Sequence, residues 1–404
     1  MTPACTLRYR DTVFQSVHVI DAAWRLGSVE VSSYRYSSLA QRLYNGAWII
    51  MSAPGLEELG ELAVHTPVYH GGGCLAEAPL YQGHARLGRE GGVEDVVRLV
   101  ESVVGEGDVE LVASLYHVKR GIRRRGGDAV EEKYFTVVDA AVAGPGGAVS
   151  ARVGFLGSPG PEHSVALRMI IRELKHRASM AAKAARLNPL ASGKWDVILS
   201  RDAASTLLHE IGHSLQASST TKLPLGARIH EELSILDDPF YPGSPASRFF
   251  DDEGVEARRK TLVEDGVVRE WLETRETACR TRGRPGNAIG LFHRPFPGWT
   301  TLCMSAGDWR EDEILEETRR GIMVDSVAEA WIDEKRVITM IPETAWYVER
   351  GSTVPLRVSR IRIRMRDLRS IDALGRRRWL RVSMEKGYVT AEAAPTIRLK
   401  AYVD

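Results

Sequence analysis

The stretch Leu207–Leu215 constrains the fold of this chain more than any other feature. It reads LLHEIGHSL, so that His209 and His213 are four residues apart and Glu210 follows the first of them. Residues at this spacing lie one turn apart on the same face of an α-helix. The three leucines and the isoleucine fall together on the other side. The pattern therefore predicts a helix over 202–217 that buries an apolar stripe and turns both imidazoles toward a cleft.

The H-E-x-x-H spacing is typical of zinc peptidases, because two imidazoles on one helical face can bind a single Zn²⁺. We therefore predict that His209 and His213 are metal ligands for Zn²⁺. A carboxylate beside such an ion can act as a general base, and this assigns Glu210 as the catalytic residue in peptide hydrolysis. The alternative interpretation is a surface helix with two solvated histidines.

A catalytic zinc site usually has three protein ligands, so the motif leaves one ligand to be found. Glu253, in the acidic cluster Asp251–Glu253, is one candidate within reach in the sequence. Cys303 has the right chemistry, but an isolated cysteine is more often part of a hydrophobic core. Three other nearby candidates are His230, Glu231 and Glu232.

A chain of 404 residues is longer than one compact core usually supports. We predict an α+β protein in three parts. Residues 1–90 form a β-rich N-terminal subdomain, and 91–190 form a central α/β segment with a long helix over 163–187. Residues 191–404 form a β-rich C-terminal domain that carries the metal-binding helix. Glycines and prolines between 66 and 92 favour a loop or linker there.

The formal net charge of +1 gives no support to a nucleic-acid-binding face. The four cysteines are dispersed and form no C-x-x-C pair, which predicts free thiols in a reducing cytosol. The sequence has no apolar run of about 18 residues that could span a membrane, and its first residues do not resemble a signal peptide. We therefore expect no membrane partner and a cytoplasmic protein.

Several further motifs occur in one order along the chain. Trp195–Ala204 leads into the metal-binding helix, Phe250–Val255 and Thr261–Val267 follow, and Pro395–Leu399 forms the closing strand. With this arrangement the chain resembles the TldD/PmbA family, also called modulators of DNA gyrase. The resemblance is specific over 190–404 and looser over 1–189. It implies a TldD-type zinc metallopeptidase that hydrolyses unfolded or small peptides.

The chain departs from the family pattern at two places. The family motif is usually H-E-x-x-x-H, one residue longer than the spacing between His209 and His213. The third zinc ligand in TldD is a cysteine near the C-terminus. Aligned on Gly387, that position falls at Ser383, and a serine hydroxyl is a poor zinc ligand. Glu385 is the nearest replacement in the sequence.

The resemblance also implies an assembly, either a homodimer or a heterodimer with a related paralogue. Its PmbA/TldE branch lacks the histidine motif altogether. Because Ser383 stands where the family has its cysteine, the alternative is a non-catalytic TldE/PmbA-like partner subunit of a peptidase complex.

Overall fold

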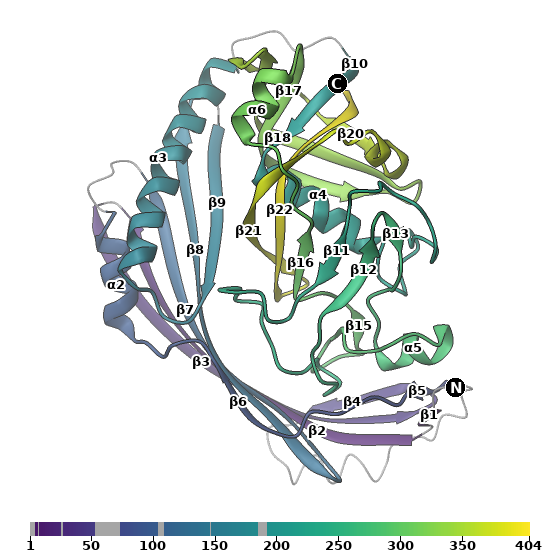
Figure 1. Cartoon of the computed structure of the whole chain (residues 1–404). Coiled ribbons are helices and arrows are strands. Elements are labelled where there is room, and N and C mark those ends of the chain that lie inside the picture. The colour runs from purple at the N-terminus through teal and green to yellow at the C-terminus, as the bar shows by residue number, and fades with distance from the viewer. Residues whose placement is uncertain are drawn as a thin grey trace.

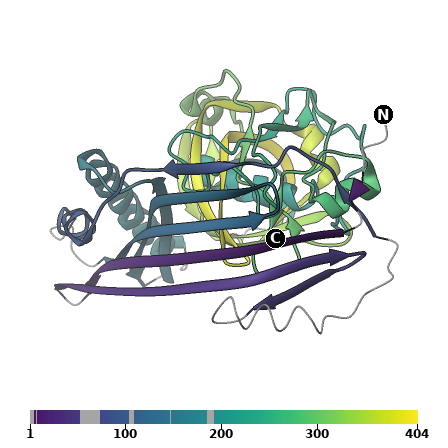
Figure 2. The same ribbon diagram turned by 90° about the horizontal axis from the view of Figure 1, so that it is seen from below.

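A computed structural model describes residues 5–6, 8–25, 27–52, 73–103, 109–145, 147–184 and 192–404 of the protein. The fold is α+β and rich in strands, as predicted. A curved N-terminal sheet lies against a C-terminal domain that is built around a second, larger sheet (Figure 1). The view from below shows the strands of the first sheet running beneath the C-terminal domain (Figure 2).

The N-terminal sheet has seven strands: β2 (Arg8–Arg25), β3 (Ser28–Asn45), β4 (Trp48–Ser52), β6 (Gly83–Leu87), β7 (Glu110–Arg124), β8 (Gly127–Gly144) and β9 (Gly147–Leu156). Their order is β4-β3-β2-β7-β8-β6, with β9 also paired to β8. β2 and β3 form one long hairpin that pairs along its whole length. Strands from residues 1–90 and from 91–190 thus share one sheet. We describe the two segments as a single N-terminal layer.

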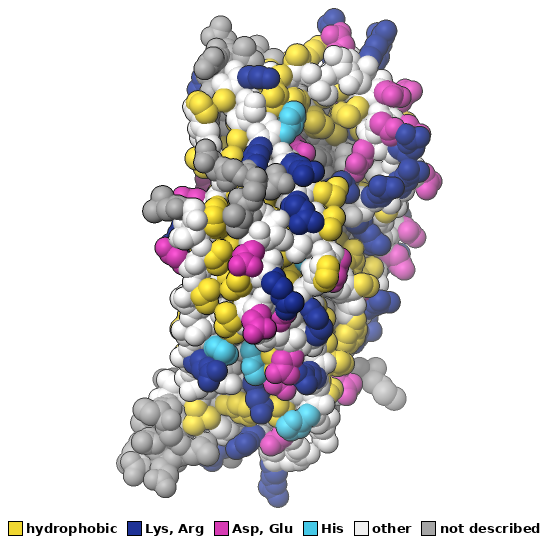
Figure 3. All heavy atoms as spheres, turned by 90° about the vertical axis from the view of Figure 1, so that its left-hand side faces the viewer, with side chains coloured by type: hydrophobic (Ala, Val, Ile, Leu, Met, Phe, Trp, Pro, Cys, Tyr) yellow, Lys and Arg dark blue, Asp and Glu magenta, His cyan; other side chains and the backbone are white. Residues whose placement is uncertain are grey.

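Two helices cover one face of this sheet: α2 (Val93–Glu101) and α3 (Pro161–Ala184). Apolar residues recur on each helix at helical spacing, and Leu99 and Leu174 are buried against Leu111 and Val138 of the sheet. The described part of α3 reaches Ala184, and 185–187, the last residues of the predicted helix, lie outside the described residues. Basic and acidic side chains are interspersed over most of this face of the molecule (Figure 3).

The C-terminal domain contains an eleven-stranded sheet made of β10 (Gly193–Leu199), β11 (Ile235–Asp237), β12 (Lys260–Glu264), β13 (Val267–Val268), β16 (Thr301–Met304), β17 (Gly321–Ile332), β18 (Val337–Glu349), β19 (Ser352–Leu356), β20 (Ile361–Arg364), β21 (Ala373–Glu385) and β22 (Tyr388–Val403). β10 pairs with both β17 and β22, and β18 and β20 complete a closed ring of strands. α4 (Arg201–His213) packs against β22 and β17, so one side of this helix is covered by the sheet.

Shorter elements complete the chain: α5 (Arg275–Thr281), α6 (Glu311–Glu317) and the 3₁₀-helix η2 (Met365–Ser370). Two small sheets pair β1 (Cys5–Thr6) with β5 (Leu75–Ala76) and β14 (Ala288–Ile289) with β15 (Phe296–Pro297). None of the helices in the described ranges is long and apolar enough to cross a membrane.

The prediction of free thiols is wrong for two of the four cysteines. Cys74 and Cys279 form a disulfide that joins the segment before β5 to α5. The two residues are 205 positions apart, so their spacing gave no sign of the pairing. Cys303 is free and buried, as expected of a core cysteine. The side chain of Cys5 lies outside the described part of the structure.

The loop predicted between 66 and 92 is also corrected in part. β6 lies within it and pairs in parallel with β8 at the edge of the sheet. Its sequence, GHARL, has no clear alternation of apolar and polar residues, and its pairing depends on a distant strand. Residues 66–72 lie outside the described residues.

Candidate metal centre

α4 places the two motif histidines, and its sequence explains how. Ser200 caps the helix by accepting a hydrogen bond from the Ala203 N–H. The apolar stripe of the helix is fully buried, as predicted. It consists of Leu207, Leu208 and Ile211, with Leu215 just beyond the last turn. Because this stripe fixes the rotation of the helix, both histidines turn to the same side.

The structure brings His209, Glu210 and His213 together, with one possible ligand atom from each lying within 4.8 Å of the others. The two imidazole rings are 5.1 Å apart between centroids. The Trp299 ring meets both of them edge-on, at 4.9 Å from His209 and 5.3 Å from His213. The helix remains regular up to His213, so the shorter spacing needs no bulge to align the rings.

Glu392, on β22, was not identified from the sequence. Its Oε1 accepts hydrogen bonds from His209 Nδ1 at 2.8 Å and from Trp299 Nε1 at 3.0 Å. A carboxylate bound to Nδ1 fixes the tautomer and leaves Nε2 of His209 free to bind a metal. The one local signal was a single acid among alanines, in the strand sequence Ala391–Ala394.

Ser383 and Glu385 lie two residues apart on β21, and the structure separates their roles. The Oε2 atom of Glu385 is 3.7 Å from Nε2 of His209 and 3.9 Å from Nε2 of His213. Ser383 lies on the other side of the His209 ring, 3.4 Å from Nδ1, and its hydroxyl donates to Glu392 at 2.9 Å. Of these two candidates, Glu385 is the one that faces the free imidazole nitrogens.

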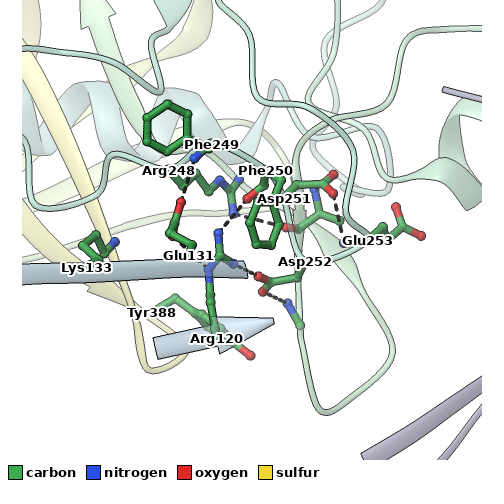
Figure 4. A network of polar contacts seen from close by, with 12 residues as sticks. Arg120, Glu131, Lys133, Arg248, Phe249, Phe250, Asp251, Asp252, Glu253 and Tyr388 are labelled. Atoms are coloured by element: carbon green, nitrogen blue, oxygen red, sulfur yellow. Dashed lines mark hydrogen bonds and ion pairs between the residues drawn. The ribbon is translucent and has the colours of Figure 1, made fainter. Parts of the chain in front are cut away.

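Glu253 is placed in a different part of the protein. It is fully buried, and its Oε2 accepts a hydrogen bond from the Arg275 N–H at 2.6 Å. It belongs to a network that joins the loop 248–253 to the N-terminal sheet (Figure 4). In that network Arg120 of β7 binds Glu131 and Asp252. Glu253 therefore contributes to the contact between the two layers.

The electrostatics of the site follow from burial and from its carboxylates. Burial raises the pKa of the Glu210 carboxyl, although the nearby His209 opposes this effect. Burial disfavours the charged form of His209, but Glu392 and Glu385 outweigh it and raise the pKa of its imidazole to about 10. The nearby His209 imidazole lowers the pKa of Glu385. Glu385 is thus held as a carboxylate, the form that binds a metal.

A cleft of about 580 Å³ lies beside His209 and Glu210, between the N-terminal sheet and the C-terminal domain. Asp139 and Arg152 line it from the N-terminal side, and Glu210 and Ser383 line it from the other. Residues 326–330 of β17 border it as well. β10 pairs with β17 only as far as Val324, so that within the described residues no strand pairs with this side of 326–330.

The donor set fits a divalent metal ion such as zinc. Two imidazole nitrogens and one carboxylate oxygen form a common catalytic zinc set, in which a fourth position is left for water or substrate, and His209 would release its Nε2 proton when the metal binds. The three side chains face one another on α4 and β21, and His209 borders the cleft. A hydrogen-bonded carboxylate also supports His209 from behind, as is usual for metal-binding histidines.

Comparisons with known proteins find relatives among the metallopeptidases. A family model described as the PmbA/TldA metallopeptidase C-terminal domain matches residues 192–401, just over half of the chain. A metalloprotease of Methanocaldococcus jannaschii is 32% identical over 191 residues, which is 44% of this chain and 42% of that protein. A zinc metalloprotease TldD homolog of Saccharolobus solfataricus is 31% identical over 140 residues, 32% of each chain. The matches thus span less than half the length of these relatives.

Two solved structures share the whole fold. A protein described as a modulator of DNA gyrase, from Thermotoga maritima, has a TM-score of 0.75 at 19% identity and covers 98% of this chain and 95% of its own. TldE from Thermococcus kodakarensis has a TM-score of 0.71 at 14% identity and covers 98% and 96%. The family match over the C-terminal domain identifies the group: this chain belongs to the PmbA/TldD family of metallopeptidases.

Proposed function

We propose that this chain is a zinc-dependent peptidase in which His209, His213 and Glu385 hold the metal. The observation that carries the proposal is the convergence of Glu385 Oε2 on the two Nε2 atoms, at 3.7 and 3.9 Å. Ser383 is then no longer needed as a ligand, and its hydroxyl instead helps to hold Glu392. When bound, zinc supplies a Lewis acid that polarises the peptide carbonyl and acidifies water.

Glu210 is the proposed general base. Burial raises the pKa of its carboxyl toward neutrality, where a group can both accept and return a proton. The backbone of Ile332, on β17, opposes part of this rise by favouring the charged carboxylate. In the proposed reaction Glu210 accepts a proton from the attacking water and passes it to the leaving amine. His209 keeps its orientation throughout because Glu392 binds its Nδ1.

The proposed substrate is an unfolded or small peptide bound as an extended strand. Residues 326–330 of β17 present backbone groups to the cleft beside Glu210. A peptide that pairs with such an edge gains main-chain hydrogen bonds with little dependence on its sequence. The folds shared with TldE and its relatives also support assembly with a second copy or with a paralogue, which analytical ultracentrifugation of the full chain can test.

The test of the proposed function combines metal analysis with one substitution. We expect stoichiometric zinc after purification without chelators, and cleavage of unfolded casein that is lost on chelation and restored by zinc. Glu210→Gln should keep the zinc and lose at least about 100-fold in kcat, the contribution of a positioned general base. Glu329→Gln is the matched control, because Glu329 lines the same cleft but is exposed.

The competing function is a non-catalytic partner subunit, which the serine at position 383 favours. If the purified protein contains no zinc and cleaves no peptide but binds a paralogous subunit, it is a non-catalytic partner subunit and the proposed peptidase function is wrong.

A further inference from the structure

A second, smaller cavity lies beside the candidate metal centre. Its volume is about 160 Å³, and it is formed between the N-terminal sheet and the C-terminal domain. Met384 lines both this cavity and the larger cleft. Trp299, whose ring meets both histidines, lines it too. The two cavities are therefore neighbours.

Three cationic side chains line this cavity: Arg120, Lys133 and Arg248. Arg120 is neutralised, because it is paired with both Glu131 and Asp252. Lys133 and Arg248 have no carboxylate within 4.0 Å among the residues that the structure describes. Figure 4 shows the three cations together with the acidic loop.

The partners of Lys133 are uncharged: two carbonyl oxygens and the ring of Phe135, whose centroid lies 5.1 Å from Nζ. Its Nζ donates to the carbonyl of Pro245 at 3.0 Å and to that of Ser247 at 3.2 Å, which leaves one of its three donors. Burial lowers the pKa of this amine to about 8. A partly buried ammonium without a counter-ion is costly, and an anion that enters the cavity would remove that cost.

Arg248 also lacks a carboxylate counter-ion among the described residues, and it is more buried than Lys133. Only 8% of its surface is exposed, and its Nε and Nη2 atoms have no hydrogen-bond partner within the described part of the chain. Its Nη1 donates to the Ala288 carbonyl at 3.2 Å. The Asp252 carboxylate of the cavity is already occupied by Arg120 and by the Gly290 N–H. The cavity thus has cationic groups in excess of available carboxylates.

We propose that this cavity is a subsite for a carboxylate of the bound peptide, either its C-terminus or the side chain of an acidic residue, and that Lys133 determines this specificity. The inference rests on the proposed function, because the carboxylate is carried by the same peptide that reaches the metal centre. The remaining Nζ donor of Lys133 provides a charge-assisted hydrogen bond to the carboxylate.

Peptide binding to the full-length Glu210→Gln variant, measured by calorimetry, tests this subsite without cleavage. Three six-residue alanine-based peptides with one central phenylalanine serve as probes: a free C-terminal acid, the same peptide as an amide, and an amide with glutamate as its last residue. We expect a carboxylate-bearing peptide to bind about tenfold more tightly than the plain amide, as one charge-assisted hydrogen bond allows. The free acid and the glutamate amide distinguish the two sources of the carboxylate.

Adding Lys133→Met should reduce this preference to about twofold or less, and Lys133→Gln is a second variant in case methionine disturbs the sheet. Lys119→Met is the matched control, because Lys119 is exposed on the same sheet and lies outside the cavity. Equal affinities for all three peptides, no binding by any of them, or a preference that survives both Lys133 substitutions would overturn the subsite. If this binding pattern holds but the wild-type protein cleaves nothing, the proposed function fails and the subsite remains.

Discussion

At the scale of single residues, the two carboxylates around His209 have different roles. One is the proposed metal ligand, and the other holds the imidazole ring in its orientation. Glu392 binds Nδ1 from within the sheet, and Ser383 binds Glu392. Glu385 lies on the opposite, Nε2 side of the same ring. The loss of a cysteine at position 383 therefore need not remove the metal site, because β21 offers a second side chain two residues further along.

This arrangement predicts a large loss of zinc affinity for one alanine substitution and a small loss for another. Glu385→Ala should weaken zinc binding by at least about 100-fold, since outer-shell changes alone cost 10–100-fold and this change removes a proposed ligand. Ser383→Ala removes only a hydrogen bond to Glu392 and should cost about tenfold at most. Competition with a chromophoric zinc chelator measures both affinities. If Ser383→Ala lost more zinc affinity than Glu385→Ala, Ser383 would be the ligand and Glu385 the supporting residue.

The site residues that could be predicted from the sequence are those that lie close together along the chain. His209, Glu210 and His213 are neighbours on one helix, so their spacing alone indicated a shared face. Trp299 and Glu392 reach the same site from distant parts of the chain, at positions that no spacing rule connects to the motif. Glu253 illustrates the converse, because it lies nearer to the motif in the sequence but is folded into the contact with the N-terminal sheet.

At the scale of elements, α4 serves as both the core of the C-terminal domain and the platform of the site. Gly212 lies inside the motif, on the side of the helix that faces Trp299 and Leu302. A Cβ atom added there would lie 2.6 Å from Leu302 Cδ1 and 3.1 Å from Trp299 Cζ3. The glycine thus allows the helix to approach the tryptophan that supports both histidines.

Gly212→Ala is therefore expected to destabilise the protein, although alanine favours a helix by about 1 kcal/mol over glycine. Overpacking a rigid core costs about 1–3 kcal/mol, and here it should also displace Trp299 and weaken zinc binding. Thermal unfolding and zinc competition measure the two effects. Gly193→Ala is the control, because its Cβ would meet only Trp195, at 3.5 Å or more. A Gly212→Ala protein with raised stability and normal zinc affinity would contradict the close packing.

Element prediction succeeded where the hydrophobic pattern is strong and local. The helix predicted over 163–187 and the motif helix both show an apolar stripe that the fold buries. The strand β6 was missed because its partner, β8, is more than 40 residues away in the sequence and its own pattern is weak. The closed ring of strands against which α4 packs likewise depends on β10 pairing with β22, at the far end of the chain.

At the scale of the whole molecule, the N-terminal layer and the C-terminal domain together form the cleft and the smaller cavity, so their contact matters for function. Arg42 of β3 binds Asp11 of β2 and also donates to the Asp252 carbonyl, and Arg120 reaches the same loop. These groups are buried, and removing one partner of such a network leaves a charge unpaired. The disulfide between Cys74 and Cys279 adds a covalent link across this contact.

The disulfide should stabilise the whole fold without taking part in the metal centre. It joins residues 205 positions apart, and closing a long loop restricts the unfolded chain more than closing a short one. Reductant, or Cys279→Ser, should therefore lower the unfolding free energy by about 2–5 kcal/mol. Zinc affinity at 25 °C should not change, because α4 is held within the C-terminal core. Thermal unfolding with and without reductant measures the effect, and Cys303→Ser, which leaves the disulfide intact, should keep the same sensitivity to reductant. A wild-type melting temperature that is unaffected by reductant, together with a titration that finds all four thiols free, would show that the two layers are held by noncovalent contacts alone.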